Sequence, residues 1–159
     1  MIYGREAELA ELDRLLTDIR AGRGRLVLIS GPAGVGKTHL AAAATAAAGR
    51  QGLTVAQSYA VEDPGAPVLW PWLRLLRDWT DLDALPALEA DEPDATARFR
   101  LLDAISDAVI ARTGPAGLLL VLEDMHWADR TSVLLLRHLH AASATQRLGV
   151  LVTCRDGTP

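Results

Sequence analysis

The sequence predicts an α/β fold in which a parallel β-sheet is covered by helices on both faces. The first observation behind this prediction is that short apolar runs, at residues 25–30, 53–59, 118–122 and 148–152, alternate with segments of helical periodicity. The second is that the run at 118–122 is apolar at every position, which is typical of a strand buried on both faces. Strands joined through helices run parallel, and the helices then cover the two faces of the sheet.

Length and composition indicate one globular domain over residues 1–159. The apolar content of 50% is enough for a core, and the net charge of −4 argues against a nucleic-acid-binding surface. The single cysteine, Cys154, forms no internal disulfide and suits a reducing compartment. The chain opens on a charged segment, and no apolar run is long enough to span a bilayer, so we expect a cytoplasmic protein without membrane contact.

The N-terminal part of the chain is predicted to alternate between helix and strand. Apolar residues recur every three or four positions over residues 5–20, which predicts an amphipathic helix. The strand at 25–30 follows, and then an alanine-rich helix over 39–50, for which Gly49 is the expected C-cap.

A long connection separates the second and third strands. Turn residues over 62–67 predict a loop, and residues 70–79 predict a short helix that carries three of the four tryptophans. We expect these rings to pack the insertion onto the core rather than to contact a ligand or partner. The acidic, proline-containing residues 81–93 predict a surface loop before a helix over 94–113. The expected buried face of that helix consists of Phe99, Leu102, Ile105, Val109 and Ile110.

His126 and Trp127 lie between the third strand and the last helix. We expect Trp127 to pack in the core. His126 is either a polar neighbour of the strand ends or a turn residue with satisfied hydrogen bonds, and the second reading is favoured because no His/Cys cluster accompanies it. Asp129 is the expected N-cap of a helix over 131–142. Its expected inward residues are Leu134, Leu135 and Leu139.

Residues 31–38, Gly-Pro-Ala-Gly-Val-Gly-Lys-Thr, fit the phosphate-binding pattern G-x-x-x-x-G-K-[ST]. A strand before the loop and a helix after it aim backbone N–H groups and the helix dipole at one place, which makes a chance match rare. Lys37 can reach the outer phosphates of a triphosphate, and the Thr38 hydroxyl can bind Mg²⁺. Lys37 is also the only lysine among 16 basic residues. The residues expected to bind the cofactor here are Gly31, Pro32, Ala33, Gly34, Val35, Gly36, Lys37, Thr38 and His39.

Glu123 and Asp124 directly follow the buried third strand, in the arrangement of Walker B carboxylates. One carboxylate is expected to hold Mg²⁺ or its water shell, and the other to position or deprotonate the attacking water. The usual order assigns Glu123 to the metal and Asp124 to the water, but strand alternation leaves this division open. Arg155 follows the fourth strand, with Thr153 before it, and is expected to contact the γ-phosphate; the alternative is a surface arginine.

These residues together resemble the ATPase module of the STAND class of P-loop NTPases. The most similar version is that of large ATP-binding LuxR-type transcriptional regulators, which is also grouped with Orc1-like AAA domains. Four segments carry the resemblance: the G-R-E-x-E-L box within 3–9, the Walker A loop at 31–38, the extended Walker B segment 120–129 that ends in H-W-A-D, and the T-x-R sensor within 152–155. The resemblance extends over essentially the whole chain.

The resemblance implies a three-layer α/β/α P-loop NTPase core that binds ATP with Mg²⁺. It implies that Tyr3, Gly4 and Arg5 help to hold the adenine, and that Lys37, Glu123, Asp124 and Arg155 are the catalytic residues. It also implies that a fifth strand, a lid and a DNA-binding part lie elsewhere, so the chain is expected to be a C-terminally incomplete fragment with an open sheet edge at 25–30. Other domains or protomers of a larger regulator are the expected partners, without direct nucleic-acid contact by this chain.

Three functions follow as hypotheses. The first is an ATP-binding and slowly hydrolysing switch in signalling or transcriptional control, a weak ATPase because lid residues are missing. The second is a non-catalytic nucleotide-binding interaction module. The third, a small-molecule P-loop kinase, is disfavoured because no arginine-rich lid segment follows the third strand. ATP is favoured over GTP because the sequence has no guanine-reading N-K-x-D segment.

Overall fold

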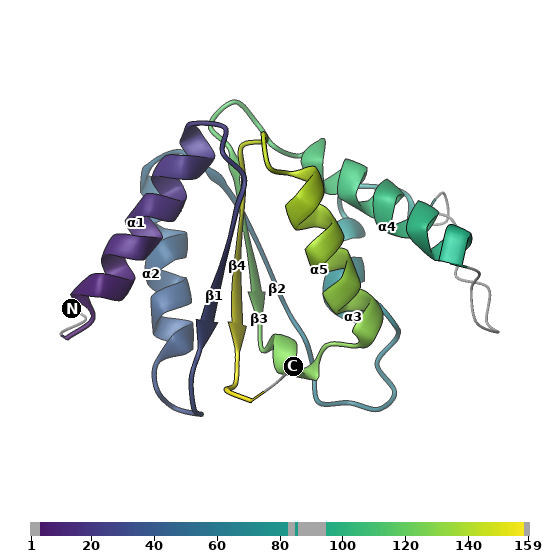
Figure 1. Cartoon of the computed structure of the whole chain (residues 1–159), viewed down its shortest axis with the longest axis horizontal. Helices are drawn as coiled ribbons and strands as arrows, with labels where there is room; N and C mark the ends of the chain where they lie inside the picture. Colours follow the sequence, from purple (N-terminus) through teal and green to yellow (C-terminus); the bar gives the residue numbers. More distant parts are fainter. Residues whose placement is uncertain (1–3, 83–84, 86–94, 158–159) are drawn as a thin grey trace.

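The computed structural model describes residues 4–82, 85 and 95–157, and shows a parallel sheet between two layers of helices (Figure 1). The strands are β1 (Arg25–Ser30), β2 (Thr54–Tyr59), β3 (Leu118–Glu123) and β4 (Leu148–Cys154). They pair in the order β1-β4-β3-β2, and every pairing is parallel. The predicted three-layer α/β fold is therefore confirmed.

Helices cover both faces of the sheet (Figure 1). The first face carries α1 (Glu6–Arg20) and α2 (Lys37–Arg50). The second face carries α3 (Trp70–Leu76), α4 (Ala95–Ile110) and α5 (Arg130–Ala142). A 3-10 turn, η2 (Met125–Trp127), joins β3 to α5 at the carboxyl ends of the strands.

The middle of the sheet is its most buried part. Leu118 to Leu122 of β3 are completely buried, as expected for a strand with neighbours on both sides and helices above and below. β1 lies at one edge of the described sheet and pairs only with β4. Its Leu28 side chain is 56% exposed, so this edge is apolar and open among the described residues.

The α1/α2 face is packed closely by small residues. Ala41, Ala44 and Ala48 of α2 are buried against the sheet. Gly149 of β4 lies so near α1 that an added Cβ atom would come 2.3 Å from Ile19 Cδ1. Glycine and alanine therefore set the short distance between this helix layer and the strands.

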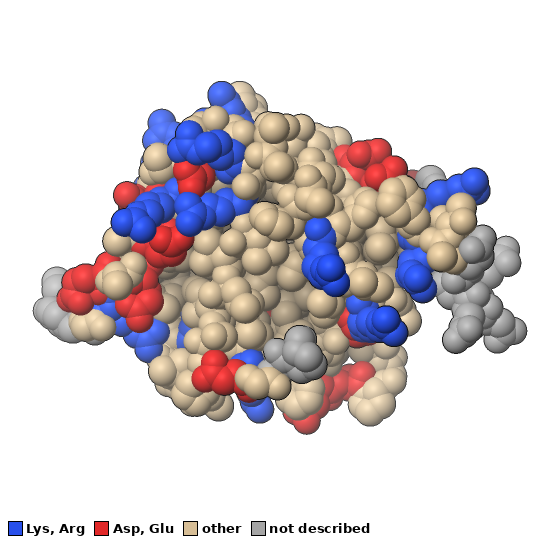
Figure 2. All heavy atoms as spheres, in the orientation of Figure 1, with Lys and Arg blue, Asp and Glu red and all other residues tan. Residues whose placement is uncertain are grey.

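Charged side chains tie α1 to the start of β1. The guanidinium of Arg25 donates to Asp18 and, from Nη2 at 2.6 Å, to Glu11 Oε1. Arg23 also donates to Asp18, with 2.6 Å between Nη2 and Oδ1. The hydrogen bonds from Arg25 and, to a smaller extent, from Arg23 hold the pKa of the Asp18 carboxyl below its ordinary value. Figure 2 shows basic and acidic side chains intermixed over α1, while most of the middle of the visible face carries neither charge.

Several expectations about single residues are wrong. Phe99 is 57% exposed, whereas Leu101 is buried. The two positions are about 200° apart around a helix, so they cannot both face the core. Trp127 is 36% exposed rather than a core residue, because η2 places it beyond the end of β3. Gly49 lies inside α2 instead of capping it, and the left-handed residue that follows the helix is Gly52, with φ of 78°.

Other boundaries agree with the sequence to within a few residues. Asp129 is the N-cap of α5, and its Oδ1 accepts from the Ser132 N–H at 3.0 Å. α3 ends at Leu76, earlier than the expected helix over 70–79. Most of the expected acidic loop over 81–93 lies outside the described residues.

Candidate functional site

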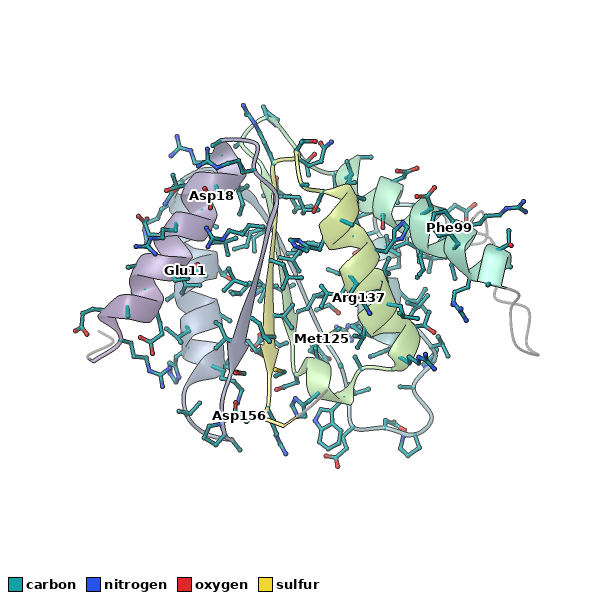
Figure 3. All side chains as sticks on the ribbon, in the orientation of Figure 1. Glu11, Asp18, Phe99, Met125, Arg137 and Asp156 are labelled. Atoms are coloured by element: carbon teal, nitrogen blue, oxygen red, sulfur yellow. The ribbon has the colours of Figure 1, made fainter. Side chains whose placement is uncertain are left out.

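A cavity of about 310 Å³ lies where the carboxyl ends of the strands meet the N-terminus of α2. Its walls come from three strand ends: the loop after β1, the residue after β3 and the residue after β4. Figure 3 shows Met125 and Asp156, which follow β3 and β4, at the same lower edge of the sheet. The residues that line the cavity are Ala33, Gly34, Gly36, Lys37, Thr38, His39, Asp124 and Arg155.

The loop after β1 depends on glycine for its shape. Gly34 and Gly36 have φ of 76° and 94°, a region that L side chains rarely adopt. Lys37, only 8% exposed, donates from Nζ to the carbonyl oxygens of Gly31 at 2.8 Å and Pro32 at 2.9 Å. The ammonium is thus held inside the loop that surrounds the cavity.

Backbone N–H groups of the same loop are available to a ligand. Those of Gly34, Gly36, Lys37 and Thr38 have no backbone acceptor among the described residues. The first N–H groups of a helix have no intrahelical partner, and here they belong to the start of α2. Unpaired N–H groups beside a lysine form an environment that suits phosphate oxygens.

Asp124 reaches the cavity through an unusual backbone. Its φ of 56° is left-handed, one of two such non-glycine residues in the described chain. Its N–H donates to Oγ1 of Thr153 at 3.0 Å, and Thr153 is buried on the neighbouring strand. Thr153 therefore positions the backbone of Asp124, a role that sequence analysis missed. Glu123 does not line the cavity, so the structure brings only one of the two acids to it.

Arg5 lies behind the loop rather than in the cavity. Arg5 donates from Nη2 to the carbonyl oxygen of Val35. It also lines a separate cavity of about 250 Å³ between α1 and β1. Gly4 has a left-handed φ of 76°, and Tyr3 lies outside the described residues. Arg5 thus supports the glycine loop from outside, while Pro32 and Val35 belong to the loop without lining the cavity.

Arg155 lies between the cavity and an exposed tryptophan. Its guanidinium carbon is 5.5 Å from the centroid of the Trp127 ring, a cation–π distance. The Trp127 ring in turn lies 4.9 Å from the ring of His126. Burial, and next the charge of Arg155, lower the pKa of the His126 imidazole.

His126 is not the satisfied turn residue that the sequence favoured. Its Nδ1 and Nε2 atoms are buried, and neither has a hydrogen-bond partner in the described part of the chain. The expectation failed because hydrogen-bond satisfaction depends on residues brought from other strands and loops, which a local pattern does not show.

The long connection is fastened to the same end of the sheet by Asp129. Its Oδ2 accepts from the N–H of Leu69 at 2.9 Å and from the Ser132 hydroxyl at 2.6 Å. Leu69 has a left-handed φ of 65° and precedes α3. Nε1 of the fully buried Trp72 donates to the Ser132 carbonyl oxygen at 3.2 Å. The expected packing of this tryptophan onto the core is thus seen.

A parallel sheet, a glycine loop before a helix and strand-end polar residues define the class of P-loop nucleotide-binding domains. The chain matches the AAA ATPase domain over residues 1–152 and belongs to that family. It is therefore an AAA+ P-loop NTPase domain, and the family binds nucleotide. No curated protein matches the chain in sequence.

Solved structures support the same fold. A DNA replication initiation factor superposes with a TM-score of 0.56 at 13% identity, covering 98% of this chain and 39% of that one. A chain from the Drosophila ORC complex with AT-rich DNA and Cdc6 gives 0.58 at 15% identity, covering 97% and 48%. A chain from Drosophila ORC bound to DNA gives 0.56 at 14% identity, covering 97% and 79%. At these identities the likeness establishes the fold alone.

Two further findings concern the described residues only. None of their helices is both long and apolar enough to cross a membrane. No three of their His, Cys, Asp or Glu side chains gather into a metal-binding group.

Proposed function

We propose that the chain is the ATP-binding and slowly ATP-hydrolysing switch module of a larger signalling or transcriptional regulator of the STAND class. One observation supports this most strongly: a single cavity unites Lys37, Asp124 and Arg155 from three strand ends. The H-W-A-D segment at 126–129 and the T-x-R segment at 153–155 support the assignment to the LuxR-type regulators.

The phosphate groups of ATP are bound by the loop and the start of α2. The unpaired N–H groups of Gly34, Gly36, Lys37 and Thr38 donate to phosphate oxygens, and the Lys37 ammonium exchanges its loop carbonyls for the outer phosphates. His39 lines the same wall. Such a constellation fits a triphosphate because it supplies many donors and one compact positive charge.

Magnesium ion, when bound with ATP, neutralises charge on the outer phosphates. Thr38 and Asp124 are the residues of the cavity that would hold it, through the hydroxyl and the carboxylate. Because Glu123 lies outside the lining, we assign the metal-side role to Asp124 rather than to Glu123. This reverses the order expected from the sequence and leaves Glu123 as a candidate that acts on water only if the turn moves.

Arg155 is placed to contact the γ-phosphate from across the cavity. A guanidinium there attracts the charge of the terminal phosphate and so distinguishes ATP from ADP. Arg5 lies against the outer side of the loop, and we retain the adenine-side role for this segment, together with Tyr3 and Gly4, as part of the proposal.

We further propose that residues 1–159 are part of a longer protein. The open β1 edge, with Leu28 56% exposed beside a cavity of about 250 Å³, is the feature that supports this. Another domain or protomer that covers the edge would remove an exposed apolar strand. Partners of this kind also fit a switch, because a nucleotide-dependent change needs a second surface on which to act.

A second candidate is a module that binds nucleotide without hydrolysing it. The absence of Glu123 from the cavity lining favours this alternative, since a single carboxylate must then serve both metal and water. Release of free phosphate from Mg-ATP, without any acceptor, separates the two candidates. A kinase would need an acceptor for turnover.

The decisive experiment is titration of the chain with Mg-ATP by calorimetry. Lys37→Met keeps bulk but removes the ammonium, and we expect about a tenfold or larger loss of affinity because charge-assisted hydrogen bonds are lost. Arg50→Ala, at the exposed far end of α2, is the matched control and should bind like wild type. Equal affinity of wild type and Lys37→Met, with both folded by circular dichroism, would refute nucleotide binding by this loop.

A further inference from the structure

His126 carries two polar atoms that lack partners. Both ring nitrogens are buried, and neither meets a hydrogen-bond partner among residues 4–82, 85 and 95–157. A neutral imidazole always offers one donor and one acceptor. Leaving such groups buried and unpaired is costly, and native proteins do so rarely. The missing partner is therefore expected to be something that arrives at this place.

The surroundings of His126 are those of the cavity. The charges that act on its imidazole belong to Arg155 after β4, Asp124 after β3, Lys37 at the start of α2 and Glu62 in the loop after β2. Three of these four residues line the cavity. His126 follows Asp124 by two residues and so lies near the cavity, although it is not one of the lining residues.

The turn that carries His126 is held in an unfavourable conformation. Asp124 begins it with a left-handed φ of 56°, although it is not glycine. The ring of Trp127 lies 4.9 Å from the imidazole ring at a tilt of 43°, and the guanidinium carbon of Arg155 lies 5.5 Å from the Trp127 centroid. Because the ring nitrogens are buried and His126 does not line the cavity, contact with a ligand requires this turn to shift.

We infer that His126 is a positioning residue for the terminal phosphate of the bound nucleotide, donating a hydrogen bond to a γ-phosphate oxygen or to a water in its first shell. The inner phosphates belong to the N–H groups of the loop, so the residues across the cavity face the last phosphate. A neutral imidazole donates from one ring nitrogen and accepts at the other, so it can serve a phosphate oxygen or a water. This inference rests on the proposed nucleotide binding and adds a residue to it.

The test compares affinities for the non-hydrolysable analogue AMP-PNP and for ADP, both with Mg²⁺, in wild type and variants. His126→Phe should lose about tenfold in affinity for AMP-PNP and keep its affinity for ADP, because only the former has a terminal phosphate. His126→Gln, which keeps a donor and an acceptor, should recover part of the loss. His140→Phe, on the exposed side of α5, is the control and should behave like wild type.

Thermal melting without nucleotide separates this role from a structural one. Removing two unpaired buried nitrogens should leave the melting temperature of His126→Phe equal or higher. If His126→Phe binds AMP-PNP and ADP in the wild-type ratio, or weakens both equally, the inference is overturned while the proposed function stands. If wild type binds neither nucleotide, both are overturned.

Discussion

The two faces of the sheet are packed against their helices by side chains of different size. On the α1/α2 face, buried alanines and Gly149 allow helices to lie close to the strands. On the α3/α4/α5 face, here called the wide face for its larger side chains, the fully buried Trp72 and leucines such as Leu76 and Leu135 fill the space against the sheet. The α1/α2 face, here called the close face, carries the glycine loop and Lys37, whereas the wide face carries the long connection between β2 and β3.

This difference in side-chain size indicates that the α1/α2 face holds its helices in a more fixed position. A short distance between α2 and the sheet leaves few ways for the helix to shift, so the N–H groups at its start keep one direction. The wide face instead anchors its insertion by polar contacts: Asp129 accepts from Leu69, and Trp72 donates to Ser132.

The largest effect is expected at the centre of the wide face. Trp72→Ala should lower the free energy of unfolding by about 3–5 kcal/mol, because it leaves a large cavity and removes the hydrogen bond to the Ser132 carbonyl oxygen. Urea denaturation followed by circular dichroism measures this. Phe99→Ala, on the same face but 57% exposed, should cost about 1 kcal/mol or less. Similar losses for both would mean that α4 is rotated from the position described.

A smaller effect is expected from enlarging a side chain on the close face. Ala44→Leu should destabilise by about 1–3 kcal/mol, because the buried position has no room for extra methyl groups. Ala46→Leu, on the exposed side of the same helix, should lie within about 0.5 kcal/mol of wild type. Denaturant midpoints of the two variants give the comparison. If Ala44→Leu is neutral, the close packing of α2 on the sheet is not as tight as the structure indicates.

The smallest effect concerns the charges that fasten α1 to β1. The pKa of Asp18 is lowered by Arg25 and Arg23, so its contribution to stability is present above the ordinary value of 3.8 and is lost as pH falls through the lower folded value. Asp18→Asn should therefore melt slightly below wild type at neutral pH, by a small amount because the pairs are at the surface. The difference should shrink as pH falls below about 4. A gap that stays constant down to acid pH would contradict this assignment.

The sequence predicted the order and type of the elements well where the signal is local. The strand at 25–30 and the helix that follows the glycine loop have the expected positions, because apolar runs and glycines determine backbone conformation over a few residues. The face of α4 was predicted less well, since Phe99 and Leu101 are equally apolar and only the neighbouring helix decides which is buried. Trp127 was misplaced for a similar reason: its burial depends on where β3 ends.

For the candidate site, the sequence predicted most of the residues that line the cavity but not the hydrogen bonds that these residues make. The glycine loop, Asp124 and Arg155 follow from motifs at strand ends. The hydrogen bond from Asp124 to Thr153 joins residues 29 apart in the chain and depends on the register between β3 and β4. No sequence motif indicates that the ring nitrogens of His126 lack partners, because this too depends on how the strands and loops are placed.

By itself, the sequence determined the parallel α/β fold and the phosphate-binding loop, because periodicity, glycine and lysine act through local backbone geometry. Only the tertiary structure decided that Asp124 rather than Glu123 lines the cavity and that Thr153 holds its backbone. It also decided that the last turn before α5 is strained and incompletely hydrogen-bonded. These features arise from the relative placement of strands and loops, which the order of residues along the chain does not reveal.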